Sequence, residues 1–166
     1  MIKRLCKWSE SMGKNVCCFI GHRETKETEK IKGKIRAAVE SLIVNENVDT
    51  FLFGSKSRFN DLCYETVTEI KEKHPRVKRV YVRAEYQHIS EDYRAYLLQS
   101  YEDTYFPESI AKAGRARYVE RNTEMINKSD FCVIHCNEKN MPATRKSGAA
   151  TALKVAEKMK KRIIRI

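Results

Sequence analysis

The sequence has little glycine and proline, with six glycines and three prolines among 166 residues. It contains no linker, internal repeat or low-complexity tract. No apolar run approaches the roughly 18 residues of a membrane-spanning helix, which excludes a transmembrane class and predicts no membrane partner. Residues 1–14 lack the continuous apolar segment of a secretion signal. We therefore expect a cytoplasmic protein with a single domain over residues 15–166, preceded by a loosely ordered basic leader over residues 1–14.

Several ligand-binding motifs are also missing. There is no C-x-x-C pair and no His/Cys cluster with zinc spacing, so we expect no bound metal. The phosphate-binding pattern G-x-x-x-x-G-K-[ST] and the dinucleotide pattern G-x-G-x-x-G are both absent, and no cofactor is predicted. The adjacent Cys17 and Cys18 would point to opposite faces of a strand, so the six cysteines are expected to be reduced and mostly buried thiols.

Positive charge is in excess, with 33 Lys and Arg against 22 Asp and Glu, which gives a net charge of +11. A surplus of this kind suits a nucleic acid, a smaller phosphorylated ligand, or a solvated surface without a binding role. Composition alone does not distinguish among these three interpretations of the positive charge.

Short apolar runs alternate with segments of helical periodicity. The runs predict strands at 16–20, 50–53, 77–82, 131–136 and 163–166. Apolar residues recur at helical spacing over 27–45, over 63–70 and over 149–159, and Pro75 ends the second of these segments. This alternation is typical of right-handed crossovers. We therefore predict an α/β fold with a Rossmann-like open, mostly parallel sheet and helices on both faces.

A tyrosine-rich insertion around residues 86–113 interrupts this rhythm. Ser90 suits the N-cap of a helix over 91–100, and a loop containing Pro107 is expected to follow. Tyrosine is enriched at interfaces, so we expect these tyrosines to pack between subunits of a homo-oligomer, with stacking on a base as the alternative.

Glycine, hydroxyl and basic residues follow three of the predicted strands, where ligands of open parallel sheets bind. They are Gly21, His22 and Arg23 after the first strand, Gly54, Ser55, Lys56 and Arg58 after the second, and Arg83 and Glu85 after the third. Glycine lets backbone N–H groups approach phosphate oxygens, and basic side chains supply charge. These positions predict an anionic ligand, while each glycine taken singly is equally suited to a tight turn.

Two helical segments add further candidates. Arg121 and Asn122 share a helix face, where they either contact a ligand or, for Arg121, form a salt bridge with a neighbouring glutamate. Ser147 suits the N-cap of the last helix, and Gly148 lets an anion approach that N-terminus.

The chain resembles the SLOG (Smf/DprA–LOG) superfamily, and within it the YpsA-like branch, over about residues 16–166. The resemblance is carried by G-H-R at 21–23, F-G-S at 53–55, R-N-x-x-M-I at 121–126, and S-D at 129–130 before a strand. It implies a Rossmann-like fold, a pocket for nucleotides or nucleotide-derived ligands, and frequent oligomers. LOG enzymes use a P-G-G-x-G-T motif to cleave an N-glycosidic bond. The matching helix entry here reads R-K-S-G-A-A-T at 145–151, so that activity does not carry over.

Three functions are therefore considered. The first is binding or sensing of a nucleotide or nucleotide-derived small ligand. The second is a hydrolase or transferase acting on a nucleoside N-glycosidic bond, which needs a positioned carboxylate such as Glu85 or Glu120. The third is single-stranded nucleic-acid binding, which requires a contiguous basic face. It would be tested by whether one face carries Lys30, Lys32, Lys34, Lys158, Lys160 and Lys161.

Overall fold

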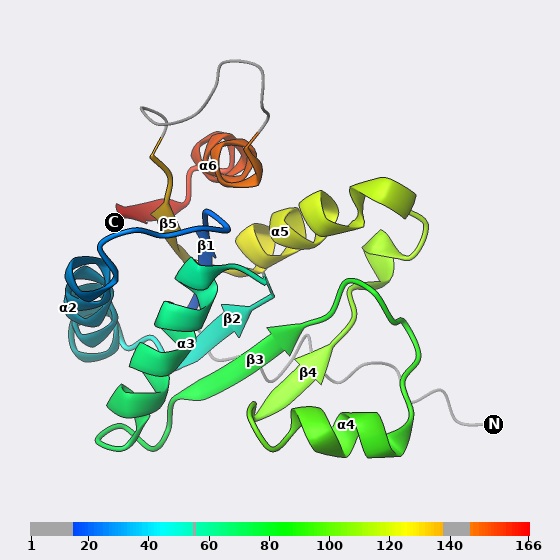
Figure 1. Cartoon of the computed structure of the whole chain (residues 1–166), viewed down its shortest axis with the longest axis horizontal. Helices are drawn as coiled ribbons and strands as arrows, with labels where there is room; N and C mark the ends of the chain where they lie inside the picture. Colours follow the sequence, from blue (N-terminus) through cyan, green and yellow to red (C-terminus); the bar gives the residue numbers. More distant parts are fainter. Residues whose placement is uncertain (1–14, 55, 138–146) are drawn as a thin grey trace.

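The structure is a computed structural model that describes residues 15–54, 56–137 and 147–166. Within them, six strands form one sheet in the order β4-β3-β2-β1-β5-β6, and each neighbouring pair is parallel (Figure 1). The strands are β1 (Val16–Gly21), β2 (Thr50–Phe53), β3 (Lys78–Val82), β4 (Asp103–Tyr105), β5 (Phe131–His135) and β6 (Arg162–Arg165). The predicted open, parallel α/β sheet is confirmed.

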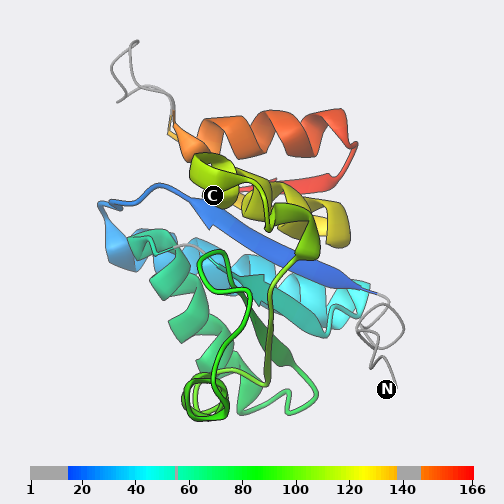
Figure 2. The same ribbon diagram turned by 90° about the vertical axis from the view of Figure 1, so that its right-hand side faces the viewer.

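Helices cover both faces of the sheet. The longer helices are α2 (Thr28–Glu46), α3 (Arg58–Lys71), α5 (Arg117–Lys128) and α6 (Gly148–Lys158). Figure 2 shows α2 and α3 on one side of β1 and α5 and α6 on the other. A short helix α4 (Glu91–Leu97) precedes β4, and two 3₁₀ turns, η1 (Glu108–Ile110) and η2 (Gly114–Ala116), precede α5. The strand order reverses between β1 and β5, and in open α/β sheets ligands bind beyond the carboxyl ends of the strands near such a reversal.

The core consists of two layers, one on each side of the sheet. Successive residues of a strand point to opposite faces, so β1 sends Phe19 to one layer and Cys18 to the other. Phe19 stacks on Phe51 with ring centroids 5.6 Å apart, in the layer under α2 and α3. Both faces of β1 and β2 are buried, which explains why these strands are continuous apolar runs in the sequence.

The tyrosine-rich segment differs from its prediction in one respect. The Ser90 side chain accepts the Tyr93 N–H at 3.2 Å and caps α4 as expected. The loop expected after this helix, however, contains β4, which pairs with β3 through the register Tyr81↔Thr104. With three residues, β4 is too short to show an alternating pattern in the sequence. The segment thus supplies the edge strand of the sheet.

Four cysteines, Cys17, Cys18, Cys63 and Cys132, are buried and form no disulfide, as predicted. Cys136 is half-buried, and Cys6 lies outside the described residues. Among the residues that the structure describes, no cluster of three His, Cys, Asp or Glu side chains could hold a metal ion. No helix in those residues is long and apolar enough to span a bilayer.

Candidate functional site

The carboxyl ends of β1, β2, β3 and β5 meet at one edge of the sheet. The register pairs Gly21 with His135 and Phe53 with Tyr81, so the residues that follow these strands are neighbours. This is the edge where the sequence predicts a ligand.

Arg121 of α5 reaches across this edge to Gly54. Its Nη1 donates a hydrogen bond to the Gly54 carbonyl oxygen. Its Nε and Nη2 lie 3.4 and 3.3 Å from Oδ1 of Asn122. A Cβ on residue 54 would lie 2.9 Å from both Arg121 Nε and Met125 Sδ, so the close approach of Arg121 requires glycine here. The structure therefore brings together three of the predicted residues, Gly54, Arg121 and Asn122.

Arg83 occupies the end of the neighbouring strand. Its backbone N–H donates to the Tyr105 carbonyl at 2.8 Å and so continues the ladder beyond β3. Its Nη1 donates to the carbonyl oxygens of Tyr86 at 2.6 Å and Gln87 at 3.4 Å. Its Nε is buried without a hydrogen-bond partner in the described chain. Burial lowers the pKa of this guanidinium, and the charge of Arg94 adds to the effect.

Two arginine side chains at this edge are buried and have no carboxylate partner in the part of the chain that the structure describes. Arg83 and Arg121 are 9% and 5% exposed, and neither has a carboxylate within 4.0 Å among residues 15–54, 56–137 and 147–166. In contrast, the exposed Lys56 lies 3.9 Å from Glu85. Folded proteins ordinarily pair the charges that they bury. This arrangement therefore suits an anion supplied by a ligand.

A pocket of about 490 Å³ lies between the start of α3 and α4. This volume is typical of a small-molecule site. Aromatic rings form much of its wall, and they belong to Tyr64, Tyr81, Tyr93, Tyr96 and Tyr101. The Tyr81 and Tyr101 rings stack 5.3 Å apart, and the Tyr93 and Tyr96 rings stack 6.1 Å apart. Lys56 and Arg58 also line the pocket and give it a positive side.

The first turn of α3 adds two polar residues to the pocket. Asn60 is 5% exposed, and its Oδ1 has no hydrogen-bond partner in the part of the chain that the structure describes. An unsatisfied buried amide is costly, so a ligand that hydrogen-bonds to Asn60 would be stabilised. Burial raises the pKa of the Asp61 carboxyl, while Arg58 opposes the rise.

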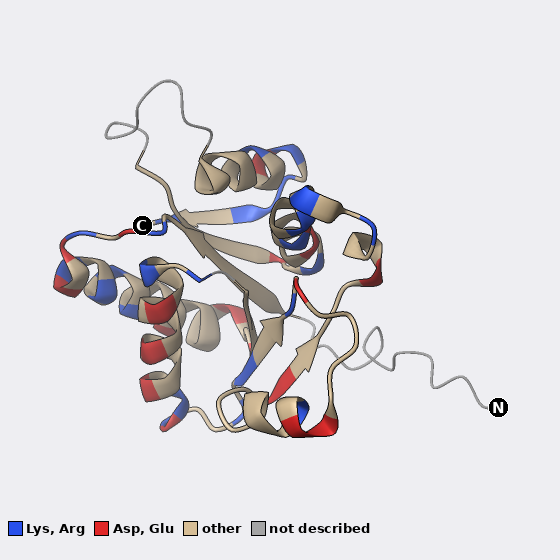
Figure 3. Ribbon diagram, turned by 45° about the vertical axis from the view of Figure 1, so that its right-hand side comes forward, with Lys and Arg blue, Asp and Glu red and all other residues tan. Residues whose placement is uncertain are grey.

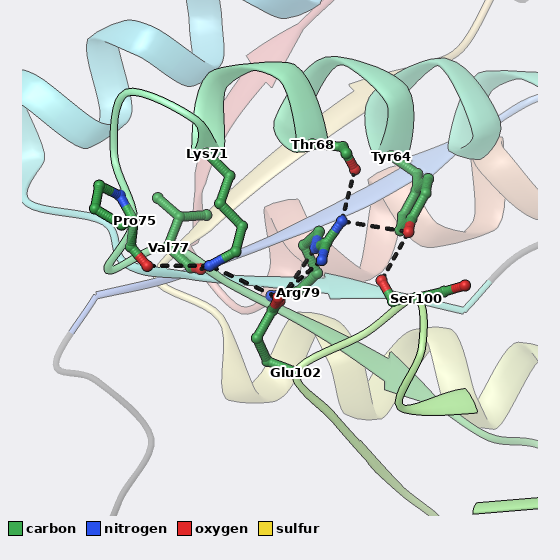
Figure 4. Close-up of polar contacts among 8 residues, drawn as sticks. All are labelled: Tyr64, Thr68, Lys71, Pro75, Val77, Arg79, Ser100 and Glu102. Atoms are coloured by element: carbon green, nitrogen blue, oxygen red, sulfur yellow. Dashed lines mark hydrogen bonds and ion pairs between the residues drawn. The ribbon is translucent and has the colours of Figure 1, made fainter. Parts of the chain in front are cut away.

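A polar network behind the pocket holds Tyr64 in place (Figure 4). The Tyr64 hydroxyl donates to the Ser100 carbonyl at 2.7 Å and accepts from Arg79 Nη1 at 3.3 Å. Arg79 Nη1 also donates to Thr68 Oγ1 at 2.9 Å. The wall of the pocket is thereby joined to β3 and to the segment before β4.

The residues after β1 make contacts within the fold. A Cβ on residue 21 would lie 2.3 Å from Phe59 Cδ1, so Gly21 serves the packing of the Phe59 ring. His22 Nε2 accepts the Asn137 N–H at 2.7 Å, and its ring lies 5.8 Å from that of His135. Burial lowers the pKa of His22, and His135 adds to this. The exposed Arg23 uses its carbonyl to accept the Arg58 N–H at 2.9 Å.

The last candidates lie on helices and at strand ends. Ser147 caps α6 by accepting the Ala150 N–H at 3.2 Å, as predicted, and the exposed Gly148 borders a small hollow that Asn122 also lines. Glu85 accepts a hydrogen bond of 2.6 Å from the Tyr118 hydroxyl, which together with Lys56 holds the pKa of Glu85 below its usual value. Glu120 is exposed on α5. Ser55 lies outside the described residues.

The sequence did not identify Asn60 and Asp61 as site residues, and it did not show that five tyrosines line one pocket. Tyr81 and Tyr64 lie outside the tyrosine-rich segment, and only the fold brings them to Tyr93, Tyr96 and Tyr101. The available signal was the alternation of Arg79, Tyr81 and Arg83, which places three polar or aromatic side chains on one face of a strand.

The two lysine groups named for nucleic-acid binding lie far apart in the fold. Lys30, Lys32 and Lys34 belong to α2, whereas Lys158, Lys160 and Lys161 lie at the end of α6 and just after it. These helices cover opposite faces of the sheet. Figure 3 shows basic and acidic residues interspersed over the helices. The six lysines do not form one basic face.

Comparison of the chain with protein-family models and with curated proteins found no match.

Proposed function

We propose that this protein binds a nucleotide or nucleotide-derived small ligand at the carboxyl ends of β2 and β3. The observation that carries the proposal is the pocket of about 490 Å³, because it combines a tyrosine wall with Lys56 and Arg58. Aromatic rings stack on bases, and basic side chains bind phosphates. A ligand with both groups satisfies both parts of the pocket.

The residues divide between the two ends of such a ligand. The base stacks on the tyrosine wall and hydrogen-bonds to Asn60. The phosphate lies toward Lys56 and Arg121, beside the glycine backbone at Gly54. The N-terminus of α6 at Ser147 and Gly148 adds N–H donors near Asn122. The same residues support a proposed membership of the SLOG superfamily.

Calorimetric titration with adenosine, AMP, ADP, ADP-ribose and cyclic AMP tests this function, with ribose 5-phosphate as the probe without a base. We expect nucleotides to bind and ribose 5-phosphate to bind at least tenfold more weakly, since stacking contributes about 1–3 kcal/mol per base. The variant Tyr96→Ala should weaken binding. Tyr86→Ala is the matched control, because Tyr86 and Tyr96 are similarly exposed, at 58% and 64%, and Tyr86 is not among the residues that line the pocket. If no nucleotide of any base binds at millimolar concentration, the proposal is wrong.

A second candidate function is hydrolysis or transfer at a nucleoside N-glycosidic bond. The observation that favours it is Asp61, a carboxyl that lines the pocket and whose pKa burial raises. The pKa of Glu85, which lies 3.9 Å from Lys56, is lowered, so the pKa values of the two carboxyls are shifted in opposite directions, as those of an acid and a base are in glycosidases. Base release from a bound nucleotide, measured by chromatography and abolished in Asp61→Asn, would support catalysis. If a nucleotide binds and stays intact over days, the protein binds the nucleotide without cleaving it.

We further propose that the protein is cytoplasmic and forms a homo-oligomer. The buried thiols that form no disulfide, Cys17, Cys18, Cys63 and Cys132, suit a reducing compartment. Exposed apolar and aromatic side chains near α4, those of Tyr86, Tyr96 and Leu98, supply a surface of the kind found between subunits. Sedimentation equilibrium of the full chain tests the assembly, and a monomer at 100 μM contradicts it.

A further inference from the structure

Three side chains of β3 and its extension share one face of the sheet. Residues two apart on a strand point the same way, so Arg79, Tyr81 and Arg83 all face α3 and α4. Arg79 pairs with Glu102 at 2.8 Å, and Tyr81 stacks on Tyr101. Arg83 lacks such a partner among the described residues. The same strand therefore carries one guanidinium with its counter-ion and one without.

The groups around Arg83 do not neutralise it. Within residues 15–54, 56–137 and 147–166, its guanidinium donates only to the uncharged carbonyl groups of Tyr86 and Gln87, and its Nε has no acceptor. The charge of Arg94, which lies 3.6 Å from Asp103, acts on Arg83 as a second cation. A guanidinium that is nine-tenths buried without a counter-ion is costly, since its charge has lost its hydration.

Arg83 adjoins both the pocket and Arg121. Tyr81, which lies two residues before Arg83 on the same side of the strand, lines the pocket. Tyr93 also lines it, and its ring lies 6.4 Å from the ring of Tyr86, whose carbonyl accepts the hydrogen bond from Arg83. The register pairs Phe53 with Tyr81, so Gly54, whose carbonyl accepts a hydrogen bond from Arg121, directly follows the residue that pairs with Tyr81. Arg83 therefore follows β3, and Arg121 of α5 contacts the residue that follows the neighbouring strand β2; neither guanidinium has a carboxylate within 4.0 Å among the described residues.

We propose that Arg83 binds a second anionic group of the ligand, and that the ligand is a nucleoside diphosphate or a diphosphate-linked nucleotide. This inference rests on the proposed function. One phosphate lies at Lys56 and Arg121, the next lies at Arg83, and the base lies on the tyrosine wall. A monophosphate leaves Arg83 unpaired.

A purely structural role for Arg83 makes a different prediction. In that case its hydrogen bonds to Tyr86 and Gln87 serve only to hold the turn after β3. Removing the guanidinium would then lower the melting temperature and would weaken the binding of nucleoside mono- and diphosphates equally. If Arg83 binds the second anion, removing its guanidinium weakens the binding of the diphosphate alone.

The test is calorimetric titration of the full chain with the mono- and diphosphates of adenosine, guanosine, cytidine and uridine at one ionic strength. For the base that binds, we expect the diphosphate to bind about 10-fold or more tightly than the monophosphate. Arg83→Met should remove this advantage and leave the affinity for the monophosphate unchanged, and Arg83→Lys should retain part of it. Arg76→Gln, which removes an exposed arginine before β3, is the matched control and should change neither affinity.

Equal affinities of the wild type for mono- and diphosphate, or an equal loss of both in Arg83→Met, would overturn the inference while the proposed function stands. Binding of no nucleotide overturns both. If Arg83→Met does not fold, the wild-type comparison and Arg83→Lys still decide.

Discussion

The guanidinium of Arg79 holds the carboxylate of Glu102 through two N–H donors, with Nε at 3.1 Å and Nη2 at 2.8 Å (Figure 4). The backbone N–H of Arg79 donates to the same carboxylate at 2.6 Å, and Lys71 Nζ lies 3.6 Å away. Through Tyr64, the network extends to the Ser100 carbonyl. It thus joins α3, β3 and the segment before β4, the elements that carry the wall of the pocket.

Replacing Glu102 with glutamine should therefore destabilise the protein. The amide keeps the shape of the carboxyl but removes the charge, and Arg79 is left without a counter-ion. Hydrogen bonds to charged groups contribute about 1.5–3 kcal/mol, so we expect a loss of about 2 kcal/mol in the free energy of unfolding, measured by urea denaturation. Glu72→Gln is the control, since Glu72 is exposed at the end of α3. Equal urea midpoints for Glu102→Gln and the wild type would contradict the assigned role.

The same carboxylate predicts a pH dependence. Burial of Glu102 acts to raise its pKa, but hydrogen bonds from the side chain and backbone of Arg79 outweigh burial and hold the pKa below its usual value. Because the folded pKa is the lower one, the stabilisation is complete above the unfolded pKa of about 4.3 and is lost as the pH falls through the folded pKa.

Urea denaturation between pH 7 and pH 3 measures this effect. We expect the difference in unfolding free energy between wild type and Glu102→Gln to be constant above pH 5 and to shrink below about pH 4.3. Other carboxylates with lowered pKa values, such as Glu69 beside Lys32, titrate in both proteins and cancel in the difference. A difference that persists unchanged to pH 3 would assign the effect of the substitution to shape and not to charge.

Most of the fold could be predicted because the buried strands are continuous and the helices are periodic. Val16–Gly21 and Thr50–Phe53 are buried on both faces, so nearly every residue in them is apolar. Asp103–Tyr105 could not be predicted in the same way. Its membership of the sheet depends on pairing with β3, which is a tertiary contact that three residues do not encode locally.

The site was predicted in part, for a similar reason. Gly54 follows an apolar strand, Arg121 and Asn122 lie on a helix, and the topology of a parallel sheet brings them to one edge. The pocket depends on rings from α3, β3, α4 and the segment before β4, and the sequence alone does not show that these meet. At Gly21, the packing of Phe59 explains the glycine without a ligand.

That packing predicts the effect of an added methyl group at residue 21. In Gly21→Ala, the new Cβ would lie 2.3 Å from Phe59 Cδ1 and 2.7 Å from Phe59 Cβ, so the ring must shift. The shift would disturb its stacking on His135, where the ring centroids are 5.4 Å apart. Overpacking of this kind costs about 1–3 kcal/mol, which urea denaturation would detect. The matched control, Gly33→Ala, adds a methyl group where no atom lies within 4 Å, inside α2. It should stabilise the protein by up to about 1 kcal/mol. Equal effects at the two positions would refute the packing role of Gly21.

The contact between Gly54 and Arg121 predicts a coupling that can be measured without a ligand. In Gly54→Ala, the methyl group would lie 2.9 Å from Arg121 Nε and would displace the guanidinium from the Gly54 carbonyl. Arg121→Met removes the same contact from the other side. Because both variants break one interaction, we expect the double variant to lose less stability than the sum of the single losses, by about 1 kcal/mol or more. Nucleotide affinity should fall in both single variants and fall little further in the double variant. Additive losses in stability and in binding would show that the two residues act independently, and Gly54 would then have no role in positioning Arg121.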